Sequence, residues 1–469
     1  MRSLSLALTI PCGALQGAPG RRRAGLGLAA AAVLALGGSG CASYTARTAG
    51  ALHDFQRGHL AAAQAAYGDT ELGGSEFLAG AEAGMVALAA GDWDGAQASL
   101  ERAAAAAADI EERALLGPER FGELLGSWVL NDTMRAYQGE GFERVYVHAG
   151  LAMAYLARGR LDDVYVEARR ANQLLEAEEK LYETSYHAGG LGHFVSALAY
   201  ELLGDWDDAT IDYQRMVEKG VGEELAGRAL VRLAGRLGRA DELALWVERF
   251  GPDLELPAGA ASVVVLAGVG LAPFKVEGSL VVPTPDGLIP FAVPIYERRP
   301  QPVAALELVE TTSGVGVRTE VLESVADVAV ENLEDRVAWM AAKSVARGIL
   351  KRELTKEAQK KHGLAGRIAG DLFAAISERA DLRAWLTLPD SWQAARLFVP
   401  PGACTYILEA RGGSSRPLGT FELEPGETLV VLARSVGTDL YAHVIGGRPV
   451  EPLPAAPAAE GAALEVHQQ

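Results

Sequence analysis

The chain has 469 residues, of which 49% are hydrophobic and 22% are charged, enough for two or three domains with sizeable cores. Its 61 acidic and 43 basic residues give a formal net charge of −18 at pH 7. Because so acidic a chain would repel phosphate backbones, we predict no nucleic-acid partner.

Residues 1–40 are typical of a secretory signal peptide. Three arginines at 21–23 precede the apolar and small-residue stretch Ala24–Leu36, and Gly37–Gly40 lead into Cys41. Small residues before a cysteine resemble a bacterial lipobox, although Gly38 stands where an aliphatic residue is usual. We therefore expect lipidation at Cys41, which would attach the protein to a membrane. An ordinary signal peptide cleaved near Cys41 and an uncleaved anchor are the alternatives.

The residues after Cys41 bear on its location. In Gram-negative lipoproteins an aspartate at the next position is the usual mark of inner-membrane retention, and here Ala42 and Ser43 follow. We therefore expect an outer-membrane lipoprotein that faces the periplasm. Loss of residues 1–40 would remove four arginines and no acidic residue, giving a net charge of −22. Cys404 would then be the one cysteine left besides Cys41, and its apolar strand pattern predicts a buried, unreactive thiol.

A short motif recurs between residues 41 and 250, which we predict to be a helical repeat domain. A glycine is followed by a polar residue, an apolar one, and in most copies a small residue five positions after the glycine, at Gly58, Gly91, Gly159, Gly204 and Gly238. Two of the glycine spacings, 33 and 34, match the tetratricopeptide repeat, and a third, 68, is twice that length. This resemblance implies a curved solenoid whose groove binds an envelope protein partner. Trp93 and Trp206, which follow Gly-Asp in two copies, are predicted to pack between repeat helices.

Polar residues gather on a glycine-broken loop before a predicted helix at 144–158. They are Asn131, Asp132, Tyr137, Glu140 and Glu143. Polar loop residues are candidates for ligand binding. The alternative is structural: Gly139 and Gly141 would permit a tight entry to the helix, and the two glutamates would complement its dipole. We favour the structural alternative and assign no catalytic residue.

Four stretches resemble a family of uncharacterised bacterial envelope lipoproteins with tetratricopeptide-like helices. They are Asn131-Asp132 with Tyr137–Glu143, then Glu167–Asn172, Gly268–Lys275 and Asp381–Pro389. The resemblance covers most of the mature chain. It implies an envelope location and no particular activity, with an association with cell-wall synthesis lipoproteins.

The sequence changes to short β-branched runs after Leu254, which predicts a β-rich domain at 255–325 and a small β-sandwich-like module at 382–446. The expected strands are Ala261–Ala267, Val276–Val282, Ile289–Tyr296, Val303–Val309, Val315–Leu322, Trp385–Leu388, Ala395–Val399, Thr405–Glu409, Leu418–Leu423, Leu429–Ala433 and Leu440–Val444. Residues 447–469 are rich in proline and alanine and are predicted to be disordered.

A long basic amphipathic helix and an apolar helix are predicted at 331–380, between the two β regions. From Lys343 to Lys361 there are seven basic residues and two glutamates. Such a helix could contact anionic lipid or wall polymer. Docking on the chain's own acidic helical half is the alternative, and we favour it.

The predicted fold class is therefore an α+β multidomain protein, with a tetratricopeptide-like helical solenoid followed by a β-rich region that contains an inserted long helix. The sequence has no Walker loop, Gly-x-Ser-x-Gly elbow or His-Glu-x-x-His motif, and His148, His187 and His193 lack a metal-binding spacing. We predict no metal, no cofactor and no enzymatic activity. A binding scaffold is the first hypothesis. A wall-polymer enzyme that uses Glu140 and Glu143, and a structural subunit of an export or surface assembly, are the alternatives.

Overall fold

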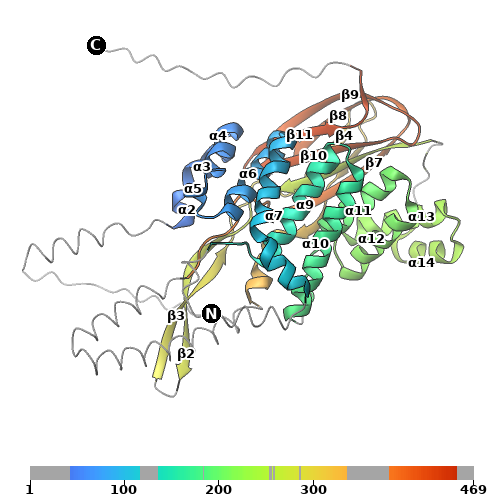
Figure 1. The fold of residues 1–469 in the computed structure, drawn as a ribbon. Coiled ribbons are helices and arrows are strands. Elements are labelled where there is room, and N and C mark those ends of the chain that lie inside the picture. Colours follow the sequence, from blue (N-terminus) through green and yellow to red (C-terminus); the bar gives the residue numbers. More distant parts are fainter. Residues whose placement is uncertain are drawn as a thin grey trace, which may run out of the picture. The chain divides into compact units, whose positions relative to one another are not determined.

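The computed structural model describes residues 43–116, 136–182, 184–252, 256, 259–284, 287–334 and 380–450 (Figure 1). The protein is a mixed α and β protein in which the long helices come first and the strands begin at residue 261, as the sequence predicts. Several predictions fall outside the described residues. They are the signal peptide at 1–40 with lipidation at Cys41, the roles of Asn131 and Asp132, the basic segment Lys343–Lys361 with the apolar helix after it, and the tail beyond residue 450.

The first half of the chain is a series of antiparallel helix pairs. The helices are α2 Tyr44–Arg47, α3 Ala49–Gln56, α4 Leu60–Tyr67, α5 Thr70–Gly73, α6 Glu76–Ala90, α7 Trp93–Leu116, α9 Gly141–Ala157, α10 Leu161–Tyr182, α11 Gly190–Leu203, α12 Trp206–Lys219, α13 Glu223–Arg236 and α14 Ala240–Phe250. The five motif glycines lie at the turns within the pairs α3–α4, α6–α7, α9–α10, α11–α12 and α13–α14. All five have φ between 69° and 84°, a conformation that side chains with a Cβ rarely adopt.

The two helices of a pair differ in burial. Here the helix before each motif glycine is called the first helix, and the helix after it the second helix. In α9 every residue from Gly141 to Leu156 is buried, and in α6 all but three are buried. Among the second helices, α14 has no buried residue, and α12 alternates buried and exposed positions. From α6 onward the first helices therefore form the interior of this half, and the second helices face outward.

The strands in the described part of the chain form two five-stranded sheets and one separate pair. They are β1 Ala261–Val269, β2 Phe274–Thr284, β3 Gly287–Glu297, β4 Leu306–Glu310, β5 Gly316–Arg318, β6 Glu320–Ser324, β7 Ser391–Val399, β8 Gly402–Ala410, β9 Ser415–Leu423, β10 Thr428–Val436, β11 Asp439–Ile445 and β12 Arg448–Pro449. The first sheet has the order β11-β10-β1-β7-β6, and the second has the order β12-β9-β8-β4-β5. Strands β2 and β3 pair with each other (Figure 1).

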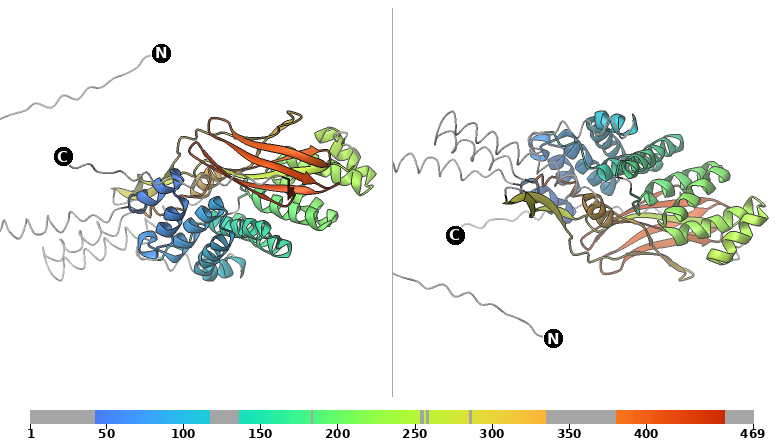
Figure 2. Two further views of the ribbon diagram at one scale, coloured as in Figure 1. Left: turned by 90° about the horizontal axis from the view of Figure 1, so that it is seen from above. Right: turned by 90° about the horizontal axis from the view of Figure 1, so that it is seen from below.

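The first sheet is buried on both faces. Along β1, Val263 and Val265 pack against the second sheet, whereas Val264 and Leu266 pack into the core of the helices. This alternation explains why β1 is a continuous apolar run, since neither face contacts water. The helices thus cover one face of the first sheet and the second sheet covers the other (Figure 2).

The sandwich joins segments that the sequence analysis assigned to two domains. Strand β1 lies between β10, to which it is parallel, and β7, to which it is antiparallel. Apart from the pair β2–β3, the strands of the β-rich region at 255–325 and of the module at 382–446 therefore form a single sandwich. The described residues from Ser43 onward also fall in one compact unit.

Three further predictions differ from the structure. The run Trp385–Leu388 is not a strand, because its backbone N–H groups bond to glutamates of distant helices. The predicted strand Val315–Leu322 is two strands in different sheets, separated by Thr319, whose hydroxyl hydrogen bonds to Gln393 Oε1 at 2.6 Å. The predicted tail begins with an ordered strand, since Arg448–Pro449 pairs with β9.

Candidate functional site

The structure brings together three of the four stretches that carry the family resemblance. The loop Tyr137–Glu143 leads into α9, Gly268–Lys275 runs from β1 into β2, and Asp381–Pro389 precedes β7. Lys275 forms an ion pair with Glu140, and the guanidinium of Arg383 lies 5.1 Å from the ring centre of Tyr137. These stretches meet where the helices contact the first sheet.

Glu143 is the centre of this cluster. It is buried, and its carboxylate accepts hydrogen bonds from the Tyr137 hydroxyl at 2.6 Å and from the backbone N–H groups of Glu140 at 2.9 Å and Trp385 at 2.8 Å. Glu140 and Glu143 also form a capping box at the start of α9. Burial raises the pKa of Glu143, and the nearby Lys275 charge opposes that shift. Two of these contacts hold backbone N–H groups, and the Tyr137 contact holds a side chain.

A second buried glutamate holds the next residues of the same segment. Glu82 of α6 is fully buried and accepts hydrogen bonds from the backbone N–H groups of Leu386 at 2.7 Å and Thr387 at 2.9 Å, and from the Tyr44 hydroxyl at 2.8 Å. Burial raises its pKa to about 7. The irregular segment 385–387 needs these acceptors because it belongs to no sheet.

Arg434 of β10 holds the other side of that segment. It is buried and donates to the carbonyl oxygens of Thr387 at 3.1 Å, Gly268 at 3.1 Å and Gly270 at 2.6 Å. Burial lowers its pKa to about 9, so it stays charged at pH 7. The carbonyl oxygens of Gly268 and Gly270 thus bind a guanidinium of the chain itself.

Two more buried glutamates connect helices to the first sheet. Glu323 of β6 accepts hydrogen bonds from Gly189 N–H at 2.6 Å and Gly190 N–H at 3.0 Å at the start of α11, and burial raises its pKa to about 7. Glu201 of α11 pairs with Arg396 of β7 at 2.6 Å and with Arg232 of α13 at 3.1 Å. Burial alone would raise the pKa of Glu201, but the two arginines outweigh it and hold the pKa near 2.

The fourth resemblance stretch, Glu167–Asn172 of α10, belongs to a separate cluster. His148 lies between Glu167, 2.6 Å from Nδ1, and Glu111, 3.2 Å from Nε2. Burial would lower the pKa of His148, but hydrogen bonds to both carboxylates raise it to about 8. Arg170 also contacts Glu111, at 3.2 Å. The cluster joins α7, α9 and α10 through charged groups.

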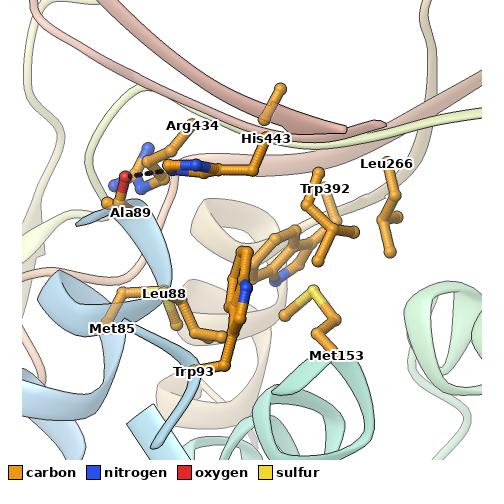
Figure 3. A pocket seen from close by; sticks show the side chains of 11 residues that line it. Met85, Leu88, Ala89, Trp93, Met153, Leu266, Trp392, Arg434 and His443 are labelled. Atoms are coloured by element: carbon orange, nitrogen blue, oxygen red, sulfur yellow. Dashed lines mark hydrogen bonds between the residues drawn. The ribbon is translucent and has the colours of Figure 1, made fainter. Parts of the chain in front are cut away.

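A small cavity of about 30 Å³ lies between the α6–α7 turn, α9 and the first sheet (Figure 3). This is room for about two water molecules. Trp93, Met153 and Trp392 are among its lining residues, and His443 packs edge-on against Trp93 at 5.3 Å and hydrogen bonds to the Ala89 carbonyl (Figure 3). No carboxylate lines it. Trp93 therefore packs between helix and sheet, where the sequence analysis expected packing between helices.

The remaining single-residue predictions have the following outcomes. Tyr137, Glu140 and Glu143 lie together, whereas Asn131 and Asp132 lie outside the described part of the chain. Cys404 is half-buried rather than buried. Trp206 is half-buried, with the Arg236 guanidinium 3.9 Å from its ring centre. Among the described residues, no group of three or more His, Cys, Asp or Glu side chains could hold a metal ion.

Sequence reasoning did not identify Glu82, Glu323, Glu201 and Arg434. Glu82 had a visible signal, because it is the one charged residue between Phe77 and Ala90 in an otherwise apolar helix. A lone carboxylate in such a helix needs a buried partner.

Comparison of the chain with models of known protein families and with curated proteins gives no match. In the part of the chain that the structure describes, no helix combines the length and the apolar character needed to cross a membrane.

Proposed function

We propose that the protein is a lipid-anchored cell-envelope scaffold that binds a partner protein in the periplasm, in connection with cell-wall or outer-membrane assembly. The signal-peptide pattern ending at Cys41 supports the anchor. The helix pairs with left-handed turn glycines support tetratricopeptide-like repeats, a fold that commonly binds proteins.

The proposal rests on the hydrogen bonds of the buried carboxylates, all of which are made within the protein. Glu82 and Glu143 each accept two backbone N–H groups and one tyrosine hydroxyl, so their oxygens are occupied within the protein. An acid–base pair would have to face a cavity that admits substrate. Glu140 instead pairs with Lys275, which is buried. The enzyme hypothesis therefore has no geometric support at these residues.

The first sheet covers the first helices, and this limits where a partner could bind. Residues of α6, α9 and α11 pack with Leu266, Trp392 and Leu432 of the first sheet in one core. A groove on that side of the array is therefore filled by the protein's own sheet. We propose that the partner contacts surfaces which the sheet leaves uncovered, including the second helices.

Crosslinked affinity purification from the native envelope tests the proposal. The exposed Asp207 and Asp208 of α12 are reversed to lysine, and Glu424→Lys at an exposed turn of the sandwich serves as the matched control. We expect a specific envelope protein with the wild type and the control, and its loss with the α12 variant. Cleavage of purified wall polymer by the protein, or recovery of no specific partner, would contradict a scaffold.

One observation favours a structural subunit of an export or surface assembly as the second candidate. Strands β2 and β3 pair over eleven residues each, and among the described strands neither joins another sheet (Figure 1). Their sequence carries no charge from Gly278 to Thr284 or from Gly287 to Tyr296. An isolated two-stranded hairpin is only marginally stable, so contact with another subunit would stabilise it.

A further inference from the structure

Four successive second helices share a surface pattern when they are aligned on their turn glycines. An aspartate stands three residues after the glycine, an aliphatic residue seven after, and an arginine eleven after. The sets are Asp94, Ala98 and Arg102 on α7, Asp162, Val166 and Arg170 on α10, Asp207, Ile211 and Arg215 on α12, and Asp241, Leu245 and Arg249 on α14. Positions four apart lie on one face of a helix, so each set forms one line.

Several charged members of this pattern have partners within the helical half. Asp207 pairs with Arg239 at the start of α14, and Arg249 pairs with Glu223 of α13 at 2.6 Å. Arg102 similarly pairs with Glu76 of α6. These three charged residues are therefore explained by packing of one helix against another.

The aliphatic members are not explained in this way. Val166 is 51% exposed, Ile211 55% and Leu245 56%. These three residues, here called the aliphatic row, occupy the same position on three successive helices that face outward. Chance exposure of single apolar residues is common, but repetition at one register position indicates a surface that is covered.

We propose that the aliphatic row is the docking surface for the chain's own basic segment Lys343–Lys361, which lies outside the described residues. The helices α10, α12 and α14 each carry more acidic than basic residues, and the segment carries seven basic residues and two acidic ones. Its sequence predicts a helix with Val345 and Ile349 on one apolar stripe. The apolar stripe of the segment thus matches the aliphatic row, and its positive charge matches the acidic excess of the three helices.

The basic segment can reach the aliphatic row from the point where the described chain ends. The described part of the chain ends at residue 334 before the basic segment. This end lies close to Tyr186, because Asn332 donates a hydrogen bond of 3.2 Å to the Tyr186 hydroxyl. From the end of α10 back to Val166 is about 24 Å along the helix. As the helix that the sequence predicts, residues 335–361 would extend about 40 Å, which exceeds this distance. Because both ends are tethered, the segment competes at a high effective concentration against any separate partner.

Hydrogen exchange of the mature chain tests the proposal. Val166, Ile211 and Leu245 are changed together to serine, and the control changes the equally exposed Val315 and Val321 to serine. Amides between 343 and 361 should exchange at least tenfold faster in the row variant and at the wild-type rate in the control. Reversal of Lys351, Arg352 and Lys356 to glutamate should have the same effect as the row variant, so the result does not depend on one set of substitutions.

Two outcomes would overturn the proposal. One is unchanged exchange of the segment in both the row variant and the charge-reversal variant, each with a wild-type thermal midpoint. The other is strong, salt-sensitive binding of the unlipidated mature chain to anionic vesicles in a sedimentation assay, because the segment would then face lipid. Docking of the segment holds whether or not the protein is a scaffold, so the affinity purification described above is judged separately.

Discussion

The buried carboxyl of Glu82 makes the stability of the protein depend on pH in a direction opposite to that of most acidic residues. Burial raises its pKa from the ordinary 4.5 to about 7 in the folded state. Between these two values the folded protein holds a proton that the unfolded chain releases. The stabilisation is therefore fully present below pH 4.5 and is lost as the pH rises through 7.

The magnitude follows from the two pKa values. Integrating the proton linkage from pH 5 to pH 8 gives a loss of about 2–3 kcal/mol in the free energy of unfolding for this one group. Glu323, whose pKa is likewise raised to about 7 by burial, should contribute a similar loss. Glu82→Gln should remove the contribution of Glu82, because the amide does not titrate.

Urea denaturation followed by tryptophan fluorescence at pH 5, 6, 7 and 8 measures the effect. We expect the wild type to lose about 2–3 kcal/mol more than Glu82→Gln between pH 5 and pH 8. The exposed Glu112→Gln should follow the wild-type curve. Parallel curves for the wild type and Glu82→Gln would refute the reasoning, since the carboxyl would then be ionised throughout.

Three further predictions follow. Mass spectrometry of the mature N-terminus should find a diacyl- or triacyl-modified Cys41, and an unmodified cysteine or cleavage elsewhere would contradict lipidation. Trp206→Ala should lower the free energy of unfolding by less than the roughly 3–5 kcal/mol of a fully buried tryptophan, since Trp206 is half-buried, and an unchanged thermal midpoint would show that it packs against nothing. Arg396→Met leaves the buried Glu201 carboxylate without one of its two arginines and should cost about 3 kcal/mol in a denaturation experiment, whereas a cost near zero would mean that Arg232 alone suffices.

Local chemistry determined much of the helical half. The turn glycines could be found from sequence because a left-handed turn between two helices favours glycine wherever it occurs, and all five have positive φ. The helix predicted at 144–158 corresponds to α9, Gly141–Ala157. The polar loop at Tyr137, Glu140 and Glu143 could also be identified from sequence, because its residues are close together in the chain.

Only the tertiary structure decided which segments meet. The apolar run Trp385–Leu388 has the composition of a strand, and sequence could not show that Glu82, about 300 residues away, would satisfy its backbone N–H groups. The pairing of β1 with β10 likewise joins residues more than 160 positions apart, so two apparent β domains became one sandwich. Periodicity reports which face of an element is apolar. It does not report what covers that face, because burial depends on contacts between elements distant in the chain.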